Sequence, residues 1–177
     1  MPLTIHDPAS GNTAAVDADN RLSVRSKSIS ELALVAREKG LAFSWSNVDY
    51  NYSAADTILA VENNSATRKL YITEVLVAGD VASEVIVHRP TSDVAMSGTG
   101  VTGVNLSGDS GEVADATAKA NESGNTQGDV LARVRIAAAG NSVSIKLPAI
   151  LSRNQMIGVD FVTVGTKANV TILGFFA

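Results

Sequence analysis

The amino-acid sequence predicts an all-β protein, an antiparallel β-sandwich with jelly-roll-like connections that follows an N-terminal arm. Short runs rich in β-branched and aromatic residues recur after residue 40, and turns containing Gly, Asn and Ser separate them. Several runs alternate apolar with polar residues, which is typical of strands with one face in water. The 177 residues correspond to about one domain, and 45% hydrophobic with 18% charged residues favours a packed core over disorder.

Eight runs supply the strands of the predicted sandwich. The run at 70–77 has the density of β-branched residues of a sandwich strand, and the runs at 133–136 and 143–147 alternate cleanly. Eight short strands joined by turns of this composition predict two packed sheets. The strands are expected at 41–52, 57–61, 69–78, 84–88, 130–137, 142–147, 155–164 and 169–176.

The first 40 residues are predicted to form an N-terminal arm ahead of a sandwich domain at 41–177. Two short alternating runs, 13–16 and 21–25, flank the turn-forming residues 17–20, which predicts a hairpin. In the second run, apolar side chains occupy one face and polar ones the other: Leu22 and Val24 against Arg21, Ser23 and Arg25.

A short helix is predicted at the end of the arm. Ser28 and Glu31 have the spacing of a capping box, in which the serine side chain accepts from a free backbone N–H of the first turn. Leu32 and Val35 belong to the apolar positions that follow, and Gly40 is a suitable helix stop. About eleven residues are too few for a helix that stands alone, so the helix is expected to dock on another surface.

Residues 97–128 are predicted to be a long, weakly patterned loop. They contain seven of the chain's 14 glycines and no aromatic residue. Such loops are uncommon inside compact domains and are usually functional or mobile. Two interpretations stay open, a solvated flexible excursion and a projecting contact loop. A short helix over 112–120 is a further expectation, although the flanking glycines weaken it.

Composition excludes several classes of function. The absence of cysteine excludes disulfide scaffolds, thiol nucleophiles and cysteine-based metal sites, and the two histidines, His6 and His88, leave little for metal or general-base chemistry. A net charge of −4 without a basic block argues against nucleic-acid binding. The N-terminus lacks the pattern of a signal peptide and no run is apolar enough to cross a membrane, so we expect synthesis in the cytoplasm and no membrane contact.

Three short motifs are better explained by turns than by chemistry. Gly108–Gly111 (GDSG) matches the core of a serine-hydrolase motif with His88 upstream, but Glu112 replaces the next glycine and a nucleophile needs a rigid mount. His88 ends a strand run before Pro90 and is instead expected at an edge or an interface. Residues 17–20 lack most ligands of a calcium loop. The glycines at 98–103 are not followed by the helix that a phosphate cradle requires. We therefore expect no catalytic residue, no metal and no cofactor.

Aromatic residues are few, and most are expected in the core or at an interface. Trp45, Tyr50 and Tyr52 offer the faces from which a sugar-binding platform is built, which keeps a carbohydrate-binding module as an alternative function. Phe175 and Phe176 end the last predicted strand, where a frayed end would stabilise little. They are expected to be buried in a central sheet or against a neighbouring subunit.

One segment carries a resemblance to a known class of protein. The opening from Gly11 to Val24 (GNTAAVDADNRLSV) resembles the start of certain tailed-bacteriophage virion proteins, in which a short N-terminal segment precedes a β-sandwich of jelly-roll type. The strand at 69–75 and the turn at 89–91 are similar as well. The resemblance spans most of the chain in layout, and the opening is its specific motif.

The resemblance implies a non-enzymatic structural protein of the virion. It implies most often a capsid decoration, or cement, protein that binds the major capsid protein at the capsid surface and stabilises the head, commonly as a homotrimer and without a cofactor. Neck, head-fibre and tail components are the alternatives that it leaves open. A carbohydrate-binding sandwich is the alternative from another class.

The arm is the part of the chain that we expect to make contact in such an assembly. Residues 1–40 are expected to reach the capsid or a neighbouring subunit, or alternatively to pack on their own sandwich. The expected contact residues are Leu22, Val24, Leu32 and Val35 as buried contacts, Arg21 and Arg25 as polar contacts, and Phe175 and Phe176 as interface candidates.

Overall fold

The computed structural model describes residues 4–6, 13–15, 30–53, 56–90, 96–123, 125–137 and 141–177. The chain divides into two compact units, residues 1–30 and residues 31–177. Each unit is described by itself below.

The first unit contains a short antiparallel ladder between β1 (Thr4–His6) and β2 (Thr13–Ala15), with Ile5 opposite Ala14. The predicted hairpin paired 13–16 with 21–25, whereas the partner that the structure describes for β2 lies upstream. Pro8, Gly11 and Asn12 separate β1 from β2, and residues of these types favour a chain reversal. The run at 21–25, including Arg21, Leu22, Val24 and Arg25, lies outside the described residues.

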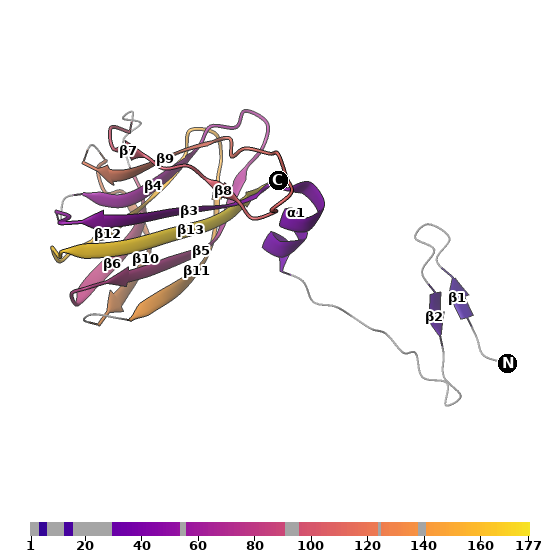
Figure 1. Ribbon diagram of the computed structural model, residues 1–177, viewed down its shortest axis with the longest axis horizontal. Coiled ribbons are helices and arrows are strands. Elements are labelled where there is room, and N and C mark those ends of the chain that lie inside the picture. The colour runs from indigo at the N-terminus through magenta and orange to yellow at the C-terminus, as the bar shows by residue number, and fades with distance from the viewer. Residues whose placement is uncertain are drawn as a thin grey trace. The chain divides into compact units, whose positions relative to one another are not determined.

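The second unit is a sandwich of antiparallel sheets with one helix, as the sequence predicts (Figure 1). Over its described residues, one sheet has the order β10-β6-β12-β4-β9-β7 and the other the order β11-β5-β13-β3-β8. Strands cover all eight predicted runs. The elements are α1 (Glu31–Lys39), β3 (Ala42–Tyr50), β4 (Thr57–Asn63), β5 (Leu70–Gly79), β6 (Ser83–Arg89), β7 (Thr99–Gly100), β8 (Val104–Asn105), β9 (Ala116–Glu122), β10 (Asp129–Ile136), β11 (Ser142–Leu151), β12 (Met156–Phe161) and β13 (Lys167–Phe176).

The long strands are nested in the manner of a jelly roll. The first long strand, β3, pairs with the last, β13, and β4 pairs with β12. Moving inward along the chain, β5 pairs with β11 and β6 with β10. This nesting is that of one long hairpin wound into two sheets, the arrangement of double-sheet jelly rolls. The predicted jelly-roll connections are therefore confirmed.

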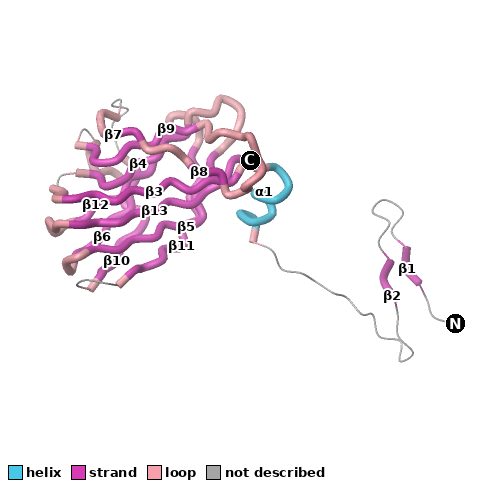
Figure 2. Tube along the Cα trace, viewed as in Figure 1, coloured by secondary structure: helices cyan, strands magenta, loops and turns pink. Residues whose placement is uncertain are grey.

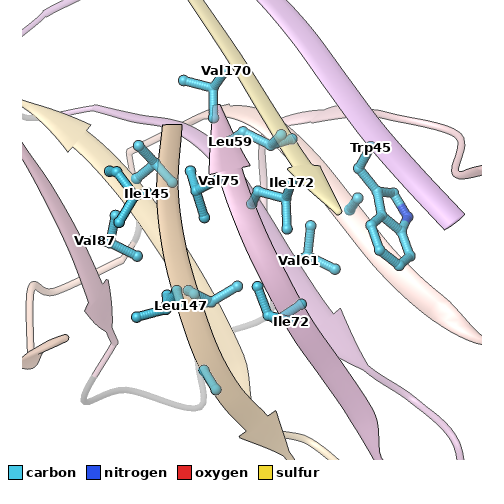
Figure 3. Close-up of a cluster of buried hydrophobic side chains, with 14 of the residues drawn as sticks. Trp45, Leu59, Val61, Ile72, Val75, Val87, Ile145, Leu147, Val170 and Ile172 are labelled. Atoms are coloured by element: carbon cyan, nitrogen blue, oxygen red, sulfur yellow. The ribbon is translucent and has the colours of Figure 1, made fainter. Parts of the chain in front are cut away.

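The core lies between the two sheets (Figure 3). The five-stranded sheet contributes side chains such as Trp45, Val75 and Ile172, and the six-stranded sheet contributes Leu59 and Val61. In β11 every second side chain is buried from Ile145 onward, because successive side chains of a strand point to opposite faces. The alternation in the sequence thus records which face of each strand meets the other sheet.

The predicted 97–128 loop contains three strands, so the expectation of a weakly structured excursion is wrong. β7 and β9 extend the six-stranded sheet beyond β4, and β8 pairs with β3 at the edge of the other sheet. The helix expected over 112–120 is a strand from Ala116 onward. Ala118 and Ala120 lie opposite Val61 and Leu59, and both alanines are buried. Small alternating residues fit this crowded edge, although alanine on its own favours helix.

Side-chain hydrogen bonds fix this segment to the rest of the sandwich. Asn105 Nδ2 donates to the backbone oxygen of Gly40 at 2.7 Å and to that of Glu112 at 3.0 Å. The buried carboxylate of Glu122 accepts from the backbone N–H of Gly98 at 2.8 Å. The segment therefore forms one side of the sandwich.

The helix α1 packs on the sandwich. Val35 is buried and Leu32 is partly buried against the core, where the helix meets β3 and β13. The helix ends at Gly40, whose φ of 61° suits glycine at a helix stop. Figure 2 shows the loop after β8 running beside α1, and Ser110 in that loop donates to the backbone oxygen of Gly40 at 3.4 Å. The helix thus belongs to the same compact unit as the sandwich.

Candidate functional site

The serine-hydrolase motif is a structural turn. Ser110 donates to the Gly40 carbonyl and accepts from the backbone N–H of Glu112 at 3.1 Å, so its hydroxyl ties the turn to the end of α1. A Cβ at Gly40 would lie 2.2 Å from Oγ of Ser110, which shows how closely the two segments approach. These contacts give the motif a structural role in joining the turn to α1.

His88 is a core residue, so its expected position at an edge or interface is wrong. It lies in β6, between β10 and β12, and its side chain is buried. Its Nε2 lies 2.9 Å from Oδ2 of Asp160 on the adjacent strand. Pro90 follows the end of β6 in the sequence. A residue at the end of a strand can still lie on an inner strand of its sheet, as His88 does.

The predicted aromatic platform is not assembled, because its three members have different surroundings. Trp45 lies in the core, and a Cβ at Gly103 would come within 2.6 Å of the indole Nε1. Tyr52 is also buried, edge-on against Phe161. Tyr50 alone of these three is exposed, at 63%, and the amino group of Lys167 lies 5.8 Å from the centre of its ring.

The two C-terminal phenylalanines are buried within their own chain, so neither presents a free interface. They lie on β13, which is the central strand of the five-stranded sheet. Phe176 faces the core and meets Phe43 edge-on at 5.8 Å between ring centroids. Phe175 lies on the other face, stacked on Tyr71 with centroids 5.1 Å apart and ring planes 4° from parallel. The first of the two expected environments, burial in a central sheet, is the one observed.

An apolar groove opens beside this stacked pair, on the outer face of the five-stranded sheet next to α1. Its volume is about 430 Å³. Ile150 is one of its most exposed members, with 43% of its surface accessible, whereas Phe175 is buried. The groove is lined by residues of β5, β11, β13 and α1 that include Glu31, Tyr71, Lys146, Pro148, Ile150 and Phe175.

Local breaks in the ladders shape the groove. The register between β11 and β5 shifts between Lys146 and Ala149, around Pro148, which has no backbone N–H to give to a ladder. A second shift in β13 begins at Gly174, where a Cβ would lie 2.7 Å from the backbone oxygen of Tyr71. Glycine therefore permits the close approach that brings Phe175 over Tyr71.

The charges at the groove are arranged around an apolar floor. Lys146 Nζ lies 2.6 Å from Oε2 of Glu74, and Ser144 donates to the other carboxylate oxygen. The hydrogen bonds from Lys146 and Ser144 lower the pKa of Glu74, so this carboxylate is ionised at neutral pH. The exposed carboxylate of Glu31, the first residue of α1, stands at the rim. The groove suits an extended apolar segment with a positive charge near Glu31.

Buried Asp49 and Tyr52 lie near the half-buried carboxylate of Asp80 at the end of β3. Burial raises the pKa of Asp49, and burial together with the nearby carboxylates of Asp80 and Asp49 raises the pKa of Tyr52. Asp80 in turn accepts from the backbone N–H of Thr166 at 3.0 Å, and hydrogen bonds from Thr166 lower its pKa. Among the described residues, no group of three or more acidic or histidine side chains is placed to hold a metal ion.

The contact residues expected from the sequence have several outcomes. Leu32 and Val35 lie on the face of α1 that packs against the sandwich. The other arm residues, Arg21, Leu22, Val24 and Arg25, lie outside the described residues. Tyr71 and Ile150 were missed by sequence reasoning. The sequence signal for this groove was Pro148 within a strand-like run, because a proline inside a strand ladder indicates an edge strand or a β-bulge.

Comparison with known proteins adds no assignment: no family model, no curated protein and no solved structure matches the chain. In the part of the chain that the structure describes, no helix is long and apolar enough to cross a membrane.

Proposed function

We propose that this chain is a non-enzymatic structural protein of a bacteriophage virion, a capsid decoration protein that binds the major capsid protein as a homotrimer. The observation that carries the proposal is the apolar groove on the outer face of a jelly-roll sandwich. Jelly rolls are a recurrent architecture of viral capsid domains, although they also occur in lectins, so the fold alone does not decide the function. The resemblance of residues 11–24 to virion proteins gives further support.

The surface chemistry suits a protein that acts by assembly. Exposed apolar side chains such as Ile150 are the material of protein interfaces. The one acid–base pair described at the groove, Glu74 with Lys146, is internally neutralised. A partner therefore meets apolar surface without having to desolvate an isolated charge at this point.

The test is binding of the purified full-length protein to phage heads that lack it. Co-sedimentation that saturates at a fixed number of copies per head, together with heads that withstand more heating or chelation, supports the proposal. Heads assembled from an unrelated capsid protein are the control. Absence of binding to heads, with binding to purified tails or necks, would replace the decoration role by one of those roles.

The mass of the free protein provides a second readout. Size-exclusion chromatography with light scattering should give a mass near three times 18.3 kDa if the trimer forms in solution. If the free protein is a monomer, the same measurement on protein eluted after chemical cross-linking on heads tests whether the trimer forms there. A monomer in both states contradicts the homotrimer.

A carbohydrate-binding module is the second candidate, and exposed Tyr50 favours it. An aromatic face next to the amino group of Lys167 resembles the start of a sugar subsite. Glycan-array binding that disappears in Tyr50→Ala would support this function. Tyr50→Phe, which keeps the ring, is the matched control, and binding lost equally in both variants would argue against ring stacking.

A further inference from the structure

The apolar groove has the dimensions and chemistry to receive an extended segment. It runs over outward-facing residues of three strands, with Tyr71, stacked on buried Phe175, as its aromatic wall and Ile150 on the β11 side. Among the described residues, β11 is the edge strand of its sheet. A volume near 430 Å³ accommodates two or three aliphatic side chains but not a folded element.

A suitable segment exists in the same sequence at 21–25. In an extended segment, Leu22 and Val24 lie on one face about 7 Å apart, and Arg21, Ser23 and Arg25 lie on the other. Two apolar side chains at this spacing match a floor formed by neighbouring strands. The lining offers one carboxylate, that of Glu31, to the positive charge of this segment, while the amino group of Lys146 in the same lining is paired with Glu74.

The position at which the chain enters the second unit points to the same segment. Residues 1–30 join the sandwich through Glu31, which itself lines the groove, so each copy carries its 21–25 segment on a tether that starts at a groove rim. The five residues 26–30 span at most about 18 Å when extended.

We propose that the groove of each copy binds residues 21–25 of a second copy, with Leu22 and Val24 against Tyr71 and Ile150. Each copy then gives one segment and receives one, so a closed ring leaves no groove empty. This exchange deepens the proposed function and rests on its assembly role, because it names the surface through which copies of the chain hold one another.

The test uses engineered cysteines, to which the cysteine-free chain gives no background. Full-length Val24→Cys protein is mixed with tagged full-length Ile150→Cys protein, oxidised and run on a non-reducing gel, both free and bound to phage heads. We expect a disulfide-linked pair of one tagged and one untagged chain. Val113→Cys, at a position that is 80% exposed and away from the groove lining, replaces Ile150→Cys as the matched control.

The outcomes separate the exchange from its alternatives. A tagged–untagged pair that exceeds the Val113→Cys control by at least fivefold supports the exchange. A yield equal to the control, in both the free and the bound state, overturns it. A double Val24→Cys, Ile150→Cys chain that cross-links only within itself also overturns it, since the segment then fills its own groove.

Charge provides an orthogonal readout. Leu22→Asp should abolish the cross-linked pair, while Ser23→Asp, which adds the same charge on the opposite face, should preserve it. Ile150 is surface-exposed, so its replacement leaves the core intact, and circular dichroism checks the fold of each variant. Co-sedimentation with heads is scored separately: binding without the cross-linked pair overturns only the exchange, and the pair without binding overturns only the decoration role.

Discussion

Replacing Asn63 by aspartate should destabilise the sandwich far more than one atom would suggest. Asn63 ends β4 and is buried, and its Nδ2 donates to the backbone oxygens of Arg68 at 3.0 Å and Leu151 at 2.8 Å. Its Oδ1 accepts from the N–H of Ser65 at 2.9 Å. Aspartate keeps the shape and the acceptor but places a carboxylate oxygen where the two donated hydrogens were.

The expected magnitude follows from these contacts. Each lost hydrogen bond contributes about 1 kcal/mol, and a buried charge facing two carbonyl oxygens adds at least as much as both together. We expect Asn63→Asp to lose about 3–5 kcal/mol at pH 7. For a chain of this size, about 2–4 °C of melting temperature accompanies each kcal/mol, so Tm should fall by about 6–20 °C.

The effect should depend on pH with a definite sign. Burial among carbonyl oxygens raises the folded-state pKa of the new carboxyl above the unfolded value of about 3.9. The folded state then binds the proton more tightly, so the penalty is largest at neutral pH, shrinks as the pH falls through the raised folded pKa, and is smallest below the unfolded value of about 3.9. Protonation also restores one donor.

Urea denaturation at pH 7 and pH 3.5 measures both effects. The control is Asn64→Asp at the next residue, whose exposed amide donates to the hydroxyl of Thr117 and whose loss should stay below about 1 kcal/mol. A loss below about 1 kcal/mol for Asn63→Asp at pH 7, or an equal loss at both pH values, would refute the assigned hydrogen bonds.

Three further predictions concern packing and charge. Gly103→Ala forces a methyl group against buried Trp45 and should lower the free energy of unfolding by about 1–3 kcal/mol, with a shift in tryptophan fluorescence. Gly100→Ala, with open space around the added methyl group, should change neither quantity, and equal effects of the two substitutions would contradict the contact. Phe176→Ala should lose about 3–5 kcal/mol in urea denaturation, and a loss below 1 kcal/mol would place this ring outside the core. Glu74→Gln should slightly destabilise the protein at pH 7 and have no effect at acid pH. A carboxyl whose folded-state pKa is lowered stabilises the folded protein above its unfolded pKa, and this stabilisation disappears as the pH falls through the folded pKa. A difference in stability that does not depend on pH would count against this reasoning.

Sequence reasoning succeeded where a strand has one face in water. Alternation of apolar and polar residues predicts β11 and β13, because their outer faces are partly exposed while Ile145, Leu147 and Ile172 point inward. It failed at β9, where the inward-facing residues are alanines. Alanine carries no strand signal, and only the opposing Leu59 and Val61 show why small residues are needed there.

The candidate site could not be predicted for a different reason. Tyr71, Ile150 and Phe175 come from three strands that are distant in the chain, and their proximity depends on the order β11-β5-β13 within the sheet. A single sequence specifies which face a side chain occupies more readily than which strand lies beside it. The two bulges that open the groove add a shift in register that periodicity alone does not show.

The nested pairing of the strands has a consequence for synthesis on the ribosome. β13 is made after every other strand of the sandwich, yet it occupies the middle of its sheet, between β5 and β3. Until it emerges, the ladder partners β11 and β5 on one side and β3 and β8 on the other have no strand to join them. Copies truncated by premature termination would keep this sheet divided and expose its core to chaperones and proteases. The topology thus makes closure of this sheet depend on translation through residue 176.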